Sequence, residues 1–174
     1  LATVRNGAIY YWDASAGTTV RASLVSSIGG ATSVPNVARV TTVSFPDRHF
    51  ITAGCQAYAV GGGGNVDDML VRWSTQEDFT KFAPTATNTA GDQRLEVGTK
   101  IVAVANGREE TIISTDEAIY GMTFVGPPFT FSFRLLATDS GAAGMNTMIS
   151  VDGNVFWMGK RNFFSYDGIV KEIP

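Results

Sequence analysis

The chain has 174 residues, a length that suits one domain with a substantial core. Only 17% of the residues are charged, against about 25% in an average soluble domain, and the net charge is −3. This balance, without a sequence cluster of Lys and Arg, argues against a protein that grips nucleic acid through its phosphates. No apolar run approaches the roughly 18 residues that a membrane-spanning helix needs, so we expect no such segment.

The composition also favours β-structure over helices. Nineteen glycines, with many threonines, serines and valines, are typical of short strands joined by tight turns. The single cysteine, Cys55, excludes a disulfide within the chain. The chain opens at Leu1 without an initiator Met or a signal-like segment, and we expect it to be a processed product or an internal portion of a longer protein.

Strand-like runs alternate with turn signals along the chain. We predict strands at residues 9–12, 37–45, 48–54, 100–105, 110–114, 119–125, 129–134, 155–158, 163–166 and 169–173. Asn106 and Gly107 predict a tight turn in which both residues take positive φ. The pair Asp152 and Gly153 predicts a second turn, and Gly126 with the two prolines that follow it reverses the chain.

Four places along the chain share one pattern of turn, short strand, turn and second strand. They begin near Gly7, Asp47, Asn106 and Asp152, so their spacings are about 40, 60 and 45 residues. This period predicts an all-β fold of antiparallel blades, a β-propeller domain over residues 1–174 that is either small or part of a larger ring. A β-sandwich with irregular strands is the alternative fold.

An insertion around residues 72–95 lengthens one of these units. Ser74 with Glu77 three residues later predicts a capped, short helical turn. Phe79 and Phe82 would share one face of that turn and point with Trp73 toward the layer beneath.

The insertion then becomes polar. Pro84 ends the expected helical turn, since proline cannot continue the backbone hydrogen bonds. Residues 85–92 are predicted to form a long polar loop.

The residue types that carry catalysis are sparse. The lone His49 is predicted to be a hydrogen-bonded structural group, and Cys55 a buried, unreactive thiol. Residues 61–64 are four glycines, but the carboxylates of Asp67 and Asp68 follow them, which favours a flexible loop over a phosphate cradle. We therefore predict no enzyme activity, no catalytic residue, no metal and no cofactor.

Several local motifs together carry a family resemblance. They are Arg72-Trp73-Ser74, the stretch 84–92, Gly126-Pro127-Pro128-Phe129, Trp157-Met158-Gly159 and Tyr166-Asp167-Gly168. With these motifs, residues 47–174 resemble the tail nozzle or tail tubular protein B family of short-tailed bacteriophages. Members of that family are longer than this chain, so the resemblance also implies a propeller-containing portion.

The resemblance implies a structural virion protein of the phage tail. Its partners would be copies of itself in a hexameric ring, the tail adaptor and the tail fibre proteins, and DNA would pass through the ring without sequence-specific binding. In this interpretation Trp73, Phe79 and Phe82 anchor the insertion, while Arg72 and Arg94 pair with acidic groups on a neighbouring subunit.

A competing interpretation is a propeller that binds or hydrolyses host-surface glycans. It would use exposed aromatic side chains such as Tyr10, Tyr11, Trp12 and Trp157 as stacking platforms, although packing in the core is the commoner role for such residues.

Overall fold

The computed structural model describes residues 1–60 and 63–174, and this part of the chain is all-β. A first, three-stranded sheet contains β1 (Ala2–Thr3), β2 (Ile9–Tyr11) and β3 (Ser23–Leu24). The second sheet contains β4 (Ala38–Val43), β5 (Phe50–Gln56), β6 (Val66–Trp73) and β7 (Gly91–Arg94). The third contains β8 (Ile101–Asn106), β9 (Thr111–Thr115), β10 (Ala118–Gly126) and β11 (Thr130–Thr138). The fourth contains β12 (Met148–Val151), β13 (Asn154–Met158), β14 (Phe163–Tyr166) and β15 (Val170–Ile173).

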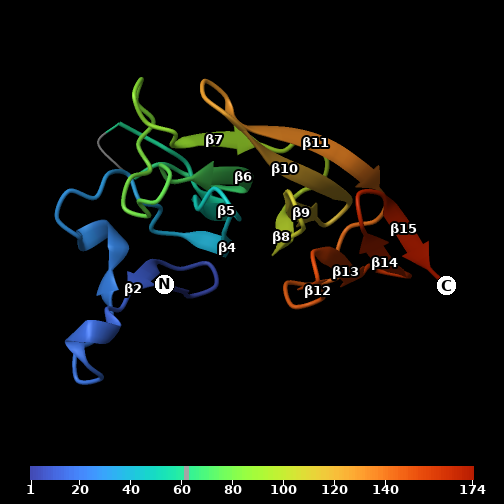
Figure 1. Cartoon of the computed structure of the whole chain (residues 1–174), viewed down its shortest axis with the longest axis horizontal. Helices are drawn as coiled ribbons and strands as arrows, with labels where there is room; N and C mark the ends of the chain where they lie inside the picture. The colour runs from blue at the N-terminus through green and yellow to red at the C-terminus, as the bar shows by residue number, and fades with distance from the viewer. Residues whose placement is uncertain (61–62) are drawn as a thin grey trace.

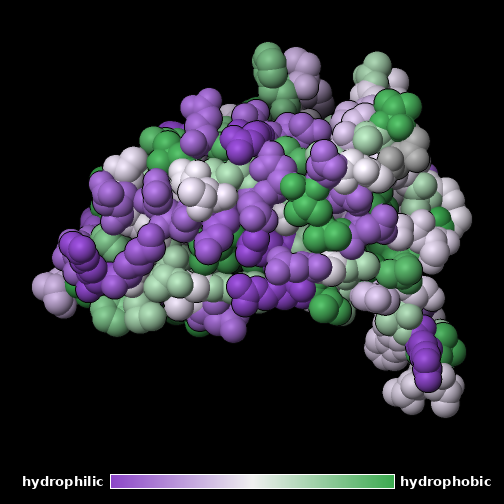
Figure 2. All heavy atoms as spheres, turned by 180° about the vertical axis from the view of Figure 1, so that it is seen from behind, coloured by the Kyte–Doolittle hydropathy of each residue, from purple (hydrophilic) through white to green (hydrophobic). Residues whose placement is uncertain are grey.

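All four sheets are antiparallel meanders in which each strand pairs with the next one along the chain. The sheets follow one another along an arc, with β4, β8 and β12 toward its inner side and β7, β11 and β15 toward its outer side (Figure 1). The inner strands are neighbours, since β8 contacts both β4 and β12. Seen from behind, the lower margin of the molecule is hollowed beside the protruding first sheet (Figure 2).

The third sheet is buried on both faces along β9 and residues 118–122 of β10. Every residue of β9 is buried, and Ile112 and Ile113 point to opposite faces because successive strand residues alternate. Ile113 packs with the second sheet and Ile112 with the fourth. A strand covered on both faces needs apolar residues that point both ways, which is why Ile112 and Ile113 are adjacent, while Thr111, Ser114 and Thr115 complete the strand as small buried polar residues.

Aromatic rings and polar links complete the packing between the sheets. Trp73 of β6 meets Phe131 of β11 edge to face, with ring centroids 5.2 Å apart. Between the third and fourth sheets, the Tyr166 hydroxyl donates a hydrogen bond to Glu110. Burial, followed by the proximity of that carboxylate, raises the pKa of Tyr166 to about 12, so the phenol stays protonated and keeps donating.

The four repeated places predicted from the sequence are the first hairpin connections of the four sheets. Gly7 lies between β1 and β2, Asp47 between β4 and β5, and Asp152 between β12 and β13, while Asn106 ends β8. The predicted spacing is therefore the distance along the chain between equivalent hairpins. Each sheet begins earlier in the chain than the predicted start of its unit, because its first strand precedes the hairpin. All-β structure with antiparallel meanders is confirmed.

The two predicted tight turns differ in outcome. Asp152 and Gly153 have φ of 50° and 80° and form a two-residue turn between the paired Val151 and Asn154. The prediction at Asn106 is wrong, because Asn106 belongs to β8, pairs with Thr111 and lacks positive φ.

Asn106 has a different role from the predicted one. Its side-chain amide donates to the Val43 carbonyl oxygen at 2.8 Å and accepts from the Thr111 hydroxyl at 3.1 Å. It therefore ties the third sheet to the end of β4. Within residues 1–60 and 63–174, no helix is long and apolar enough to cross a membrane.

Candidate functional site

The insertion predicted around residues 72–95 is the connection between β6 and β7, and Trp73 anchors its start. The Trp73 ring is buried in the core between the second and third sheets. Its indole N–H donates to the Thr89 carbonyl oxygen at 2.8 Å. A β-carbon at Gly91 would lie 2.6 Å from Trp73 Cζ2, so the end of the connection passes the ring only because that residue is glycine.

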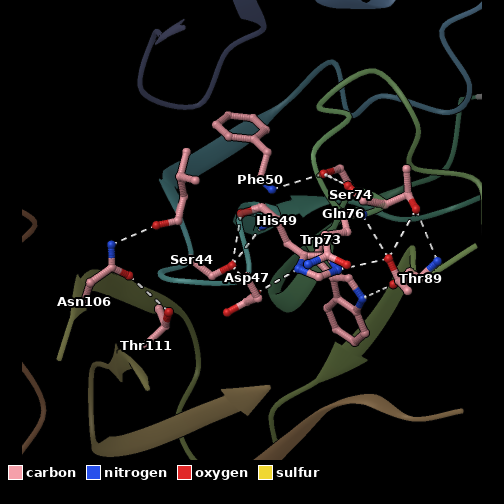
Figure 3. Close-up of polar contacts among 12 residues, drawn as sticks. Ser44, Asp47, His49, Phe50, Trp73, Ser74, Gln76, Thr89, Asn106 and Thr111 are labelled. Carbon is pink, nitrogen blue, oxygen red and sulfur yellow. Dashed lines mark hydrogen bonds and ion pairs between the residues drawn. The ribbon is translucent and has the colours of Figure 1, made fainter. Parts of the chain in front are cut away.

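Thr89 is the polar centre of this connection (Figure 3). Its Oγ1 lies 3.0 Å from His49 Nε2 and 3.2 Å from Thr75 Oγ1, and it accepts a hydrogen bond from the Gln76 backbone N–H at 2.9 Å. Three groups thus bind this hydroxyl. His49 comes from the connection between β4 and β5, and Thr75 and Gln76 come from the connection between β6 and β7 itself.

His49 is fully buried, as its interpretation as a structural group predicts. Its Nδ1 lies 2.8 Å from Asp47 Oδ2, and its ring packs against Phe124 and Phe131 of the third sheet. Burial lowers the pKa of His49, and the Asp47 carboxylate offsets part of that effect. In the neutral ring, Nδ1 donates to Asp47 and Nε2 accepts the Thr89 hydroxyl proton.

The order of carboxylate, imidazole and hydroxyl is one that activates nucleophiles in hydrolases. Here the imidazole is sealed under two aromatic rings, and the Thr89 hydroxyl is already bound by Thr75 and Gln76 as well as His49. The hydrogen bonds from Asp47 through His49 to Thr89 therefore hold the connection between β6 and β7 against the second sheet.

Arg72 is an internal tie rather than a surface cation. It is 1% exposed, and its guanidinium donates to the carbonyl oxygens of Gln56 at 2.9 Å, Ser33 at 2.9 Å and Phe82 at 3.2 Å. The guanidinium also lies over the Phe82 ring, 5.7 Å from its centroid. Burial lowers the pKa of Arg72. No signal in the sequence distinguishes such a carbonyl-bound arginine from one that faces a neighbour.

The remaining predicted residues divide between anchors and surface. Phe82 is fully buried and meets Phe50 edge to face at 6.2 Å, while the half-buried Phe79 packs on Tyr11 of the first sheet at 5.3 Å. Arg94 is different, because its side chain is 61% exposed and its Nε donates to Asp67 Oδ2 of β6 at 2.8 Å. The aromatic residues therefore fasten the connection on both sides, to the first and third sheets.

The predicted helical turn at Ser74 is wrong. The Ser74 hydroxyl accepts from the Phe50 backbone N–H at 3.0 Å, and Glu77 has a φ of 59° and pairs with Arg48. Residues 75–81 instead form tight turns closed by a hydrogen bond from Thr75 N–H to Lys81 O at 2.8 Å. Ser74 and Glu77 thus bind Phe50 and Arg48 instead of each other, so the predicted capping box does not form. The predicted polar loop is also shorter than expected, since residues 91–92 belong to β7.

Cys55 is fully buried, and burial raises the pKa of its thiol to about 11, so it stays protonated as predicted. Of the predicted glycine loop, residues 61–62 lie outside the part of the chain that the structure describes. Among the described residues, no group of three or more His, Cys, Asp or Glu side chains is placed to hold a metal ion.

A scan against protein-family models finds no match for this chain, and a search of curated proteins finds no relative.

Replacing Arg72 by Met should lower the free energy of unfolding by about 3 kcal/mol or more, because three buried carbonyl oxygens lose their donor. Arg94→Met removes an exposed ion pair and should cost less than about 1 kcal/mol. Urea unfolding of both variants checks this, and equal losses would contradict the internal role of Arg72.

The stability of the protein should fall as the pH drops below about 6.5. The folded-state pKa of His49 is lower than the unfolded value, so the unfolded chain takes up a proton that the folded chain excludes. The stabilisation is therefore present above the unfolded pKa and is lost as the pH falls through the folded pKa, by at most about 1.4 kcal/mol per pH unit.

Urea unfolding at several pH values from about 7.5 to about 5.5, on either side of the ordinary histidine pKa, measures this dependence. The chain has one histidine, so the His49→Gln variant should lack the dependence in this window. If the free energy of unfolding of the wild type and of the variant changed with pH in the same way, His49 would not be the cause of the dependence.

Proposed function

We propose that this chain is a β-propeller part of a structural protein of the phage tail, one that forms the nozzle ring through which DNA leaves the virion. The observation that carries the proposal is the stack of successive four-stranded meanders with their first strands innermost, which is how propeller blades are built. The motifs that resemble the nozzle family supply the functional part of the proposal.

Those motifs supply residues that hold the stack together. Trp73 lies between the second and third sheets, and Trp157 and Tyr166 lie between the third and fourth. The resemblance therefore includes buried aromatic residues that fix the geometry of a rigid scaffold. This fits a protein whose work is mechanical.

The fourth sheet supports the idea that further sheets follow in the assembled protein. Its covered face holds Val155, Trp157 and Tyr166, all buried against the third sheet. Its opposite face is open and apolar, with Ile149 62% exposed and Phe163 58% exposed. Val151, Met158 and Ile173 are also exposed hydrophobic residues of this sheet.

An apolar sheet face of this kind usually marks a contact surface. We infer that another four-stranded sheet packs on it, in the way that the second and fourth sheets pack on the third. In the proposed ring, copies of the protein form a hexamer that joins the tail adaptor and the tail fibre proteins. The connection between β6 and β7 then makes contacts or acts as a gate.

A glycan-binding propeller is the second candidate, and Trp12 favours it. Trp12 is 43% exposed on the protruding first sheet, where its indole N–H donates to the Val20 carbonyl oxygen at 3.1 Å. Trp157 is buried and offers no stacking surface. Saturable glycan binding that is lost in Trp12→Ala would favour this candidate, and an unaffected Trp12→Ala variant would remove it.

Negative-stain electron microscopy of the whole purified protein should show rings with a central hole. Phe163→Glu should reduce the fraction of rings, because a carboxylate on the apolar face, between the paired Met158 and Ile173, opposes packing of the next sheet. Phe129→Glu is the matched control, since Phe129 is exposed in the turn between β10 and β11. Particles that remain single subunits, alone and with the other tail components, would contradict the proposal.

A further inference from the structure

One groove of the molecule receives a cation from each of the four sheets. Its volume is about 220 Å³. The cations are Arg5 from the connection between β1 and β2, Arg39 from β4, Lys100 immediately before β8, and Lys160 from the connection between β13 and β14. The groove is also lined by Asp116 and by small and apolar residues near the starts of β8 and β12.

The topology explains why these residues converge. Arg39 and Lys100 lie where the neighbouring inner strands β4 and β8 begin. The antiparallel pairing of Met148 with Trp157 brings the end of β13, and hence Lys160, back to the start of β12. Arg39, Lys100 and Lys160 thus gather at equivalent ends of the second, third and fourth sheets. Arg5 joins them because the bridge between Gly7 and Ala38 brings the β1–β2 connection to the start of β4.

The charges in this groove are predominantly positive. Arg5, Lys100 and Lys160 are exposed and join no ion pair with any residue that the structure describes. Arg39 is held in place, with its side chain 16% exposed and its Nη2 2.6 Å from Asp68 Oδ1.

The Asp116 carboxylate, between β9 and β10, is engaged by the segment that precedes β8. It accepts from the backbone N–H of Thr99 at 2.8 Å, from the Thr99 hydroxyl at 2.6 Å, and from the backbone N–H of Lys100 at 3.3 Å. Burial alone would raise the pKa of Asp116, but these bonds lower it to about 2, so it is ionised. Four cations therefore face two carboxylates, those of Asp116 and Asp68.

We propose that this groove binds phosphate groups. Arginine and lysine side chains that converge from several directions are the usual protein partners of phosphate oxygens, and three of the four here form no ion pair with the residues that the structure describes. The groove on the other side of Asp116 is lined by Asp116, Glu117 and Asp139 together with Lys160 and Arg161, so an anion is favoured only on the Arg5 side. The fold thus assembles a basic cluster that the sequence does not reveal.

Phosphate groups reach such a groove either in a DNA backbone or in a small phosphorylated molecule. Two probes distinguish these sources in the whole purified protein. Isothermal titration with inorganic pyrophosphate reports binding of a small phosphate. Fluorescence anisotropy with a short labelled DNA duplex, measured over a range of salt concentrations, reports binding of the backbone.

The groove variant combines Lys100→Gln with Lys160→Gln. The control variant combines Arg21→Gln with Lys171→Gln, two exposed cations that do not line the groove, and it changes the net charge equally. All four side chains are exposed, and circular dichroism with thermal unfolding verifies that both variants keep the fold. We expect the groove variant to bind about tenfold or more weakly and to show a salt slope for DNA smaller by about two, while the control binds like the wild type.

If the wild type binds both pyrophosphate and DNA and the groove variant loses both, the proposal is supported, with a DNA backbone as the source of phosphate. If the wild type binds pyrophosphate but not DNA, and the groove variant loses the pyrophosphate binding, the proposal is supported, with a small phosphorylated molecule as the ligand. Absence of binding of either probe to the wild type, or equal loss in the two variants, overturns it. The result is independent of ring formation, because binding is measured on the protein in whatever assembly state it has.

Discussion

β9 and residues 118–122 of β10, in the third sheet, are buried on both faces, and the places of the neighbouring sheets follow from that burial. Ile113 and Tyr120 face the second sheet, while Ile112 and Ile119 face the fourth. Because strand residues alternate between faces, this sheet cannot be stable with either neighbour removed. The sheets therefore form one continuous stack, and the exposed face of the fourth sheet is the place where that stack is open.

The connection between β6 and β7 is positioned by the same stack of sheets. Trp73 and His49 both lie against aromatic rings of the third sheet and both bind Thr89, so the position of the connection follows from the packing of two sheets. Arg72 and Phe82 secure the other side. A segment fixed by this many buried groups can carry contacts to other molecules without losing its own shape.

The sequence predicted what depends on local pattern and missed what depends on tertiary partners. Strand runs and the Asp152-Gly153 turn follow from residue alternation and backbone preference, and both are present. Ser74 was predicted to cap a helical turn, but its hydroxyl is taken by the backbone of Phe50 from another strand. The carbonyl partners of Arg72 and the gathering of four cations in one groove also come from distant parts of the chain, which no local pattern records.

The proposed ring depends on the open face of the fourth sheet packing against another sheet of the same kind. A cryo-electron microscopy structure of the whole protein in its assembled state, at a resolution that shows side chains, would reveal what lies on this face. We expect Ile149 and Phe163 to be covered there by another four-stranded antiparallel sheet. A structure in which both side chains remain in solvent, or are covered by something other than a sheet, would contradict this packing.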